Sequence, residues 1–167
     1  MRCLSFFTGN ELFAVDVTLV QKVVRKMTIT PVPTAPDAVV GIGNIKGRVV
    51  TLIDLCELLG RKRKRDEAVA ANAVDAVIFK PFRGGGDQIG LVIDKRGNLI
   101  DINDDAVSLP SLATGAEESF CISGIAEVDN KLYRIISMDS ILERHRHPGE
   151  KITNITLNGG NENDGQN

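Results

Sequence analysis

The stretch GIGNIKGRVVTLIDL, residues 41–55, allows two opposite interpretations of the chain. Its glycines and its lysine could wrap a phosphate group, or they could form the tight turn between two β-strands. A dinucleotide-binding loop follows the pattern GxGxxG and leads into a helix. Here the third glycine comes one residue too late, and residues typical of a strand follow it. The stretch therefore predicts a β-hairpin that turns at Lys46-Gly47.

The same pattern returns in the second half of the chain. Residues 41–59, GIGNIKGRVVTLIDLCELL, align without gaps with residues 124–142, GIAEVDNKLYRIISMDSIL. The apolar positions coincide, and Lys46-Gly47 falls on Asp129-Asn130, a pair that tolerates the positive φ of a tight turn. Two copies of one β-unit are the simplest explanation. A unit of about five short strands with a terminal helical turn suits a small barrel.

The bulk composition fits a small β-rich protein. Of the 167 residues, 43% are hydrophobic but only 4% are aromatic, so Val, Ile and Leu must supply most of the core. Cys3, Cys56 and Cys121 form no CxxC pair, which favours a reducing cytosol over a disulfide or metal site. No stretch reaches the roughly 18 apolar residues of a membrane span. We expect a cytoplasmic protein without metal or cofactor and without insertion into the membrane.

We expect one domain over residues 1–144. The first barrel is predicted mainly over residues 3–60 and the second mainly over 73–142, and the sequence leaves open whether the N-terminal strand crosses to the other barrel. Residues 61–72, which begin with RKRKR, are interpreted as a basic connector. Residues 145–167 are polar and rich in Gly and Asn, and they are predicted to form a flexible, disordered tail because they bury too little apolar surface to offset the entropy of ordering.

Three polar clusters could carry chemistry, and each has a simpler explanation. Asp54 and Glu57 could act as paired carboxylates, but they also fit the N-terminal cap of a short helix. His145 and His147 form an HxH pair without a convergent further ligand in the sequence. The run RKRKR, residues 61–65, could bind nucleic acid, although it lacks interleaved aromatic residues. We predict no catalytic residues, and a small-barrel nucleic-acid-binding protein is the alternative function.

Three stretches resemble the CheW family of chemotaxis adaptors. Residues 33–55, PTAPDAVVGIGNIKGRVVTLIDL, are similar to the signature block of that family, a proline-bearing loop followed by G-V-x-N-L-R-G-x-V-x-P-V-I-D-L. Residues 6–17, FFTGNELFAVDV, resemble its N-terminal pattern, and residues 89–94, IGLVID, resemble a strand of its second half. The resemblance extends over residues 3–143.

The resemblance implies a mainly β fold of two SH3-like five-stranded barrels with short helical turns. It also implies a non-catalytic adaptor that couples the cytoplasmic tips of methyl-accepting chemoreceptors to the regulatory domain of a CheA-type histidine kinase. Such an adaptor is cytoplasmic, associated with membrane receptor arrays, and binds no nucleic acid. Its contribution is a coupling free energy between the conformations of receptor and kinase.

Position in the family pattern makes five residues candidates for contacts with the kinase or the receptor: Val20, Lys22, Gly41, Lys46 and Leu99. The residues also allow structural roles, since Val20 could belong to a barrel core, the lysines to solvated surface, and Gly41 to a close backbone approach. The family usually has Glu and Arg where this chain has Lys22 and Lys46. Because Arg can bind a carboxylate through two parallel hydrogen bonds and Lys cannot, these differences bear on the choice of partner.

Overall fold

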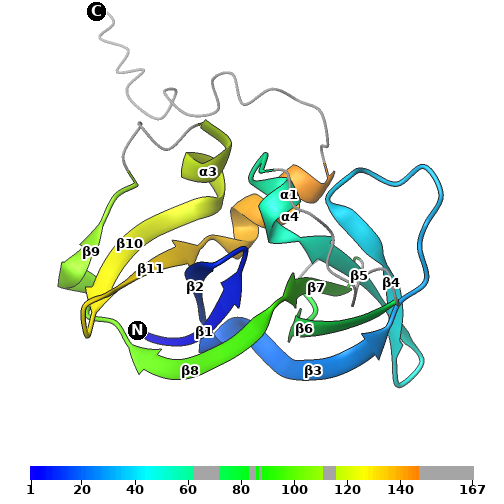
Figure 1. The fold of residues 1–167 in the computed structure, drawn as a ribbon, viewed down its shortest axis with the longest axis horizontal. Coiled ribbons are helices and arrows are strands. Elements are labelled where there is room, and N and C mark those ends of the chain that lie inside the picture. Colours follow the sequence, from blue (N-terminus) through cyan, green and yellow to red (C-terminus); the bar gives the residue numbers. More distant parts are fainter. Residues whose placement is uncertain (62–71, 83–85, 87, 111–115, 147–167) are drawn as a thin grey trace, which may run out of the picture.

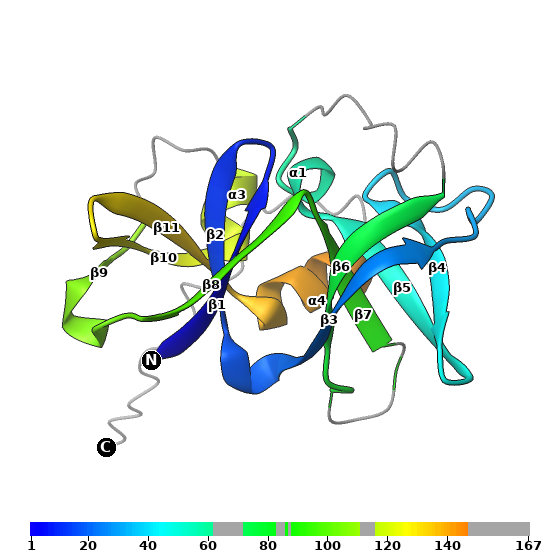
Figure 2. The same cartoon turned by 60° about the horizontal axis from the view of Figure 1, so that its bottom comes forward.

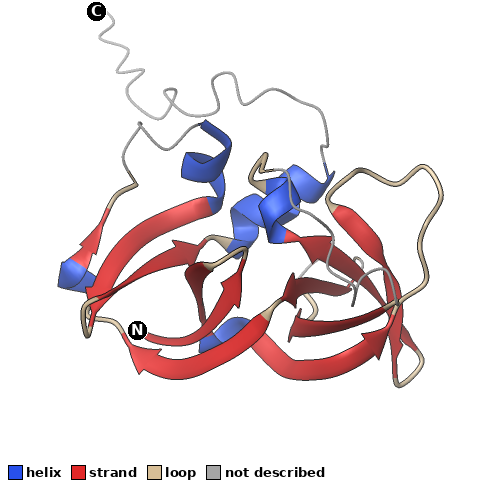
Figure 3. Ribbon diagram, in the orientation of Figure 1, coloured by secondary structure: helices blue, strands red, loops and turns tan. Residues whose placement is uncertain are grey.

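The strands form two curved sheets that lie side by side, with short helices gathered along one side of their junction (Figures 1 and 3). This arrangement comes from a computed structural model, which describes residues 1–61, 72–82, 86, 88–110 and 116–146. Strands dominate the described residues, as the sequence predicts, and the mainly β fold class is confirmed.

The first sheet, barrel 1, consists of β3 (Val20–Thr28), β4 (Val39–Ile45), β5 (Arg48–Asp54), β6 (Ala73–Phe79) and β7 (Gln88–Ile93), in the order β3-β6-β7-β5-β4. The second sheet, barrel 2, consists of β1 (Arg2–Thr8), β2 (Glu11–Asp16), β8 (Lys95–Asp101), β9 (Val107–Ser108), β10 (Ile122–Val128) and β11 (Lys131–Ile136), in the order β8-β1-β2-β11-β10-β9. The helical segments are η1 (Val17–Leu19), α1 (Leu55–Leu58), η2 (Asp104–Ala106), α3 (Ala116–Cys121) and α4 (Met138–Arg146).

Both sheets curl until their two ends approach each other. In barrel 1, Thr30 follows β3 and exchanges backbone hydrogen bonds of 2.8 and 2.9 Å with Ile42 of β4, at the opposite end of the strand order. In barrel 2, β9 follows β8 through η2 and pairs with β10. The exposed edges of both sheets are thereby shortened, which limits unwanted strand pairing.

The two barrels repeat one arrangement. The hairpin β4–β5 followed by α1 corresponds to β10–β11 followed by α4, and the second strand of each hairpin pairs in parallel with a strand from elsewhere in the chain, β7 or β2. Both hairpins turn through residues with positive φ, Lys46 (50°) and Gly47 (84°) in one and Asp129 (50°) and Asn130 (58°) in the other. The predicted hairpin is therefore confirmed, and the phosphate-loop interpretation is wrong.

The predicted helix cap after β5 is also present. The carboxylate of Asp54 accepts hydrogen bonds from the backbone N–H of Cys56 at 2.9 Å and of Glu57 at 3.5 Å, and α1 begins at the next residue. Gly60 has a φ of 74°, a left-handed conformation that ends the helix. The carboxylate of Asp54 thus serves the start of a helix, as predicted.

Three apolar clusters hold the fold together. One lies inside barrel 1 and contains Val50, Leu52 and Ile78, and one lies inside barrel 2 and contains Tyr133 and Ile135. The largest, here the central core cluster, joins the two barrels. Its members from the strands of both barrels are Leu4, Phe6, Phe13, Val15, Ile53, Val77, Phe79, Ile89, Leu91, Ile93, Ile122 and Ile136. Because the largest cluster lies between the barrels, the two halves form one cooperative unit.

The sheets divide the chain differently from the barrels predicted over residues 3–60 and 73–142. The N-terminal hairpin β1–β2 pairs with β8 and β11 in barrel 2, while β6 and β7 pair with β3 and β5 in barrel 1. Barrel 2 also has six strands in the described residues, because β8 and β9 join it. Alternation of apolar residues shows that a strand has a buried face, but it does not specify which sheet the strand joins.

The basic connector lies outside the described residues except for Arg61 and Asn72. Of the predicted tail, His145 and Arg146 belong to the last turn of α4, and residues 147–167 lie outside the described residues. None of the helices in the described ranges is both long and apolar enough to cross a membrane.

Candidate protein-binding groove between the barrels

A groove of about 440 Å³ opens where β3 and β6 of barrel 1 approach the start of β8 of barrel 2. Figure 2 shows β3 and β8 on either side of this junction. The residues that line the groove are Val23, Arg25, Asp75, Asp94, Lys95 and Arg96. Val23 also packs against the central core cluster, so the groove lies directly over the contact between the barrels.

On the β3 wall, a β-bulge brings Val20 and Val23 to the same face of the strand. Residues three apart in a regular strand point to opposite faces. Here the register with β6 shifts after Val20, so that Val20 lies opposite Phe79 and Val23 lies opposite Val77. Both opposing side chains belong to the central core cluster. The side chains of Val20 and Val23 therefore project from the face of β3 that is on the groove side.

The β8 wall has an equivalent bulge. The register with β1 shifts so that Arg96 lies opposite Phe6 and Leu99 lies opposite Leu4, and both opposing side chains belong to the central core cluster. Arg96 and Leu99 are three residues apart, yet they leave β8 on the same face. Leu99 is 58% exposed. Strand register thus puts two of the predicted residues, Val20 and Leu99, on the same strand faces as the groove-lining Val23 and Arg96, although neither is itself among the residues that line the groove.

The other three predicted residues lie elsewhere. Lys22 pairs with Ile78, whose side chain is in the core of barrel 1, so Lys22 leaves β3 on the face away from the groove. Gly41 is buried in β4, and a Cβ there would lie 2.6 Å from the carbonyl oxygen of Thr30. Lys46 is exposed in the turn between β4 and β5, at the far end of barrel 1 (Figure 1). The five predicted residues therefore do not form a single site.

Sequence reasoning missed the charged residues of the groove. Arg25, Lys95 and Arg96 come from two strands that are about 70 residues apart in the chain. The strand β8 itself was not predicted, because its sequence KRGNLID contains charges, Gly and Asn, which are rare in strands. The bulges bring these side chains to one face of each strand. They interrupt the regular alternation of side chains between the two faces, from which the face of a residue would be predicted.

A comparison with known protein families identifies the family of this chain. The family whose description is "CheW-like domain" matches residues 2–146. The chain belongs to this family. The CheW-like match covers both barrels and α4, so the whole described structure is the family domain.

Known relatives agree with the CheW-like assignment. The chain is 24% identical over 139 residues to the chemotaxis protein CheW of Rhizobium meliloti (strain 1021), which covers 83% of this chain and 84% of that protein. It is 24% identical over 143 residues to the chemotaxis protein CheW of Thermotoga maritima, which covers 84% and 86%. The solved structure of the scaffolding protein TtCheW from Thermoanaerobacter tengcongensis superposes with a TM-score of 0.69 at 25% identity, covering 82% of this chain and 88% of that one.

This CheW-like domain also contains a ring of four charges that joins the end of α1 to β2, β11 and α3. Arg61, which follows α1, forms ion pairs with Glu11 of β2 and with Glu118 of α3, at 2.6 Å for the latter. Arg134 of β11 closes the ring, at 3.0 Å from Glu11 and 3.2 Å from Glu118. The first residue of the run RKRKR is therefore bound to carboxylates, and the other four, residues 62–65, lie outside the described residues. Nothing in the described part favours nucleic-acid binding by this run.

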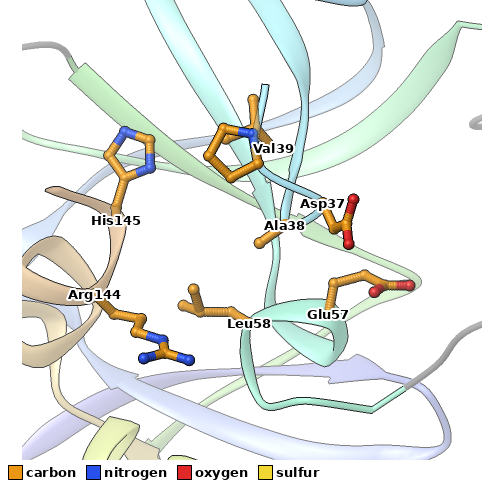
Figure 4. A pocket seen from close by; sticks show the side chains of 8 residues that line it. Asp37, Ala38, Val39, Glu57, Leu58, Arg144 and His145 are labelled. Atoms are coloured by element: carbon orange, nitrogen blue, oxygen red, sulfur yellow. The ribbon is translucent and has the colours of Figure 1, made fainter. Parts of the chain in front are cut away.

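A smaller pocket of about 220 Å³ lies where the loop before β4 meets α1 and the end of α4. Figure 4 shows Asp37 and Glu57 on one side of it and Arg144 and His145 on the other. Its base is apolar and includes Leu58. Across the described ranges, no group of three or more His, Cys, Asp or Glu side chains is arranged to hold a metal ion. The charged side chains of this pocket thus do not form a metal centre.

The three cysteines are buried. Burial raises the pKa of the Cys3 thiol to about 11, so that this thiol is protonated at neutral pH. A protonated buried thiol is a poor nucleophile. Cys3 therefore acts as an apolar core residue of barrel 2.

Proposed function

We propose that this protein is a non-catalytic adaptor of bacterial chemotaxis that couples chemoreceptors to a CheA-type histidine kinase. The observation that supports this most strongly is the CheW-like match over residues 2–146, together with relatives named chemotaxis protein CheW that align over 83–84% of the chain. The relative of known structure carries the description of a scaffolding protein. The adaptor would act in the cytoplasm, at the membrane receptor arrays.

The two partners would use different surfaces. The regulatory domain of the kinase would bind barrel 1 at the β4–β5 hairpin, with contacts from Lys46 and from the backbone near Gly41, and with Lys22 on the neighbouring part of the barrel. The cytoplasmic tip of a chemoreceptor would bind in the groove, against Val20 and Leu99. Separate surfaces permit both partners to bind at once, which coupling between them requires.

Each pairwise contact is expected to have an affinity of about micromolar or weaker, since adaptors in arrays gain strength from many linked contacts. The function is tested with the immobilised full chain and two soluble partners, the regulatory domain of the kinase and a receptor tip fragment. We expect both to bind, singly and together. Folded protein that binds neither partner would refute the adaptor function.

Two variants separate the surfaces. Lys46→Glu reverses an exposed charge in the β4–β5 turn and should weaken binding of the kinase domain without changing binding of the receptor tip. Leu99→Asp places a charge on the groove-side face of β8 and should do the opposite. If both variants affect both partners equally, the assignment of partners to separate surfaces is wrong.

A further inference from the structure

The groove presents positive charge from both of its walls. Arg25 is exposed on β3, and Lys95 and Arg96 are exposed at the start of β8. Within the described residues, no ion pair involves any of these three side chains. The ammonium group of Lys95 lies 5.9 Å from the centre of the Phe7 ring, a cation–π contact that orients it without neutralising it.

The two carboxylates of the groove are engaged by backbone groups. Asp75 accepts a hydrogen bond of 2.8 Å from the N–H of Lys26, and Asp94 accepts one of 2.7 Å from the N–H of Gly9. Carboxylates that accept backbone N–H groups are fixed in orientation. Each therefore has a structural role at the edge of the groove, while the guanidinium groups of Arg25 and Arg96 keep their donors for a partner.

Two β-bulges hold these arginines in place. On β3, Arg25 and Lys26 together oppose the single residue Asp75, and the bond from Lys26 N–H to the Asp75 carboxylate fastens this bulge. The extra residue here shifts the alternation of the strand, so that it differs on the two sides of the bulge. The side chain of Arg25 leaves from a position opposite Asp75, on the same groove wall as Val23.

On β8, Gly97 and Asn98 together oppose Ser5. The buried Ser5 hydroxyl accepts the N–H of Asn98 at 2.9 Å and donates to the carbonyl of Asn98 at 2.8 Å. A Cβ at position 97 would lie 2.8 Å from the carbonyl oxygen of Ser5, so glycine is required there. This second bulge keeps Arg96 and Leu99 on one face.

We propose that the groove selects a partner segment with an acidic and apolar face, whose carboxylates bind Arg25 and Arg96 while its apolar residues pack on Val20, Val23 and Leu99. This inference rests on the proposed function, because it assigns that segment to the chemoreceptor tip. The charge of the groove identifies the chemistry of the partner: two guanidinium groups, one on each wall, can each bind a carboxylate through parallel hydrogen bonds. The groove thus sets which receptor sequences the adaptor accepts.

The test measures binding of a soluble chemoreceptor tip fragment to the full chain, at several NaCl concentrations. The charge-reversed variant Arg25→Glu/Arg96→Glu should lower the affinity by roughly ten- to a hundred-fold, since each lost charge-assisted contact is replaced by repulsion. The variant Arg25→Lys/Arg96→Lys keeps the charge but loses the two-point geometry, and it should retain part of the affinity. Lys131→Glu, at the exposed start of β11, reverses one charge outside the groove lining, a smaller change in net charge than that of the double variant, and should have no effect.

Binding of the kinase regulatory domain is measured with the same variants as a check on folding, and it should be unchanged. If the wild-type chain binds the tip but the charge-reversed variant binds it equally well, or if added salt has no effect, the electrostatic selection is refuted and the adaptor function stands. If the wild-type chain binds the kinase domain but not the tip, the receptor part of the proposed function fails, and this inference fails with it.

Discussion

The ring of Arg61, Glu11, Glu118 and Arg134 gives the sharpest prediction about stability. Glu118 is the most buried member, with a side chain 10% exposed, and it accepts hydrogen bonds from Arg61 at 2.6 Å and from Arg134 at 3.2 Å. Arg61 follows α1, while the other three residues belong to β2, α3 and β11 around barrel 2. The ring therefore fastens the end of α1 to barrel 2.

The substitution Glu118→Gln keeps the size of the side chain and removes its charge. The two guanidinium groups would then share the single carboxylate of Glu11. Removal of one partner from a fully buried ion pair costs about 3–5 kcal/mol. Arg61 and Arg134 are 32% and 24% exposed, so solvent screens part of the lost attraction, and we expect a loss of about 2–3 kcal/mol in the free energy of unfolding. For a chain of this length that corresponds to a fall of roughly 5–10 °C in Tm.

The assay is urea unfolding followed by far-UV circular dichroism, at low and at high salt. The matched control is Asp101→Asn, which removes the largely exposed ion pair between Arg2 and Asp101 and should leave stability nearly unchanged. A double-mutant cycle with Arg134→Met isolates the coupling between Glu118 and Arg134, and we expect it to be about 1–2 kcal/mol. Wild-type stability of Glu118→Gln, or an equal loss of stability in Asp101→Asn, would contradict a stabilising role of the ring.

Three further predictions use other parts of the fold. Gly41→Ala should lower the free energy of unfolding by about 2 kcal/mol, because its Cβ would lie 2.6 Å from the Thr30 carbonyl and disturb the closure of barrel 1; urea unfolding measures this, and an unchanged midpoint would contradict it. Thiol reagents at pH 8 should modify Cys3 only after unfolding, because burial raises the thiol pKa to about 11. Mass spectrometry measures the extent of modification over time, and rapid modification of Cys3 in the native chain would contradict this prediction. The hydrogen bond from Arg2 lowers the pKa of Asp101, so any stabilisation by this pair is present above the ordinary Asp pKa and is lost as the pH falls through the lowered value; an NMR titration should show the carboxyl returning to its ordinary pKa in Arg2→Ala.

Much of the architecture could be predicted from local sequence. The hairpin at Lys46-Gly47 follows from residues that accept positive φ, and the cap at Asp54 follows from a side chain that can accept backbone N–H groups. Both depend on neighbours within a few positions. The repeat of residues 41–59 in 124–142 likewise predicted two copies of one unit, because the same local pattern gives the same local structure.

The groove could not be predicted in the same way. Val20 and Leu99 were candidates through the family resemblance alone, and the alternation of apolar residues did not assign either to a shared surface. Arg25 and Arg96 did not stand out, because two charged residues on separate strands are usually solvated surface. Only the pairing of β3 with β6 and of β8 with β1 shows that bulges bring these side chains to the two walls.

Local sequence patterns were sufficient to predict the class of the fold, its duplicated unit, the turns and caps, and the family. Tertiary structure decided that the hairpin β1–β2 joins barrel 2 and that β6 and β7 join barrel 1. The physical reason is that turns and caps depend on backbone preferences of adjacent residues, whereas the choice of sheet depends on burial between distant segments. Leu4 and Phe6 can be buried in many ways, and the packing against Val77 and Phe79 in the central core cluster selects one of them.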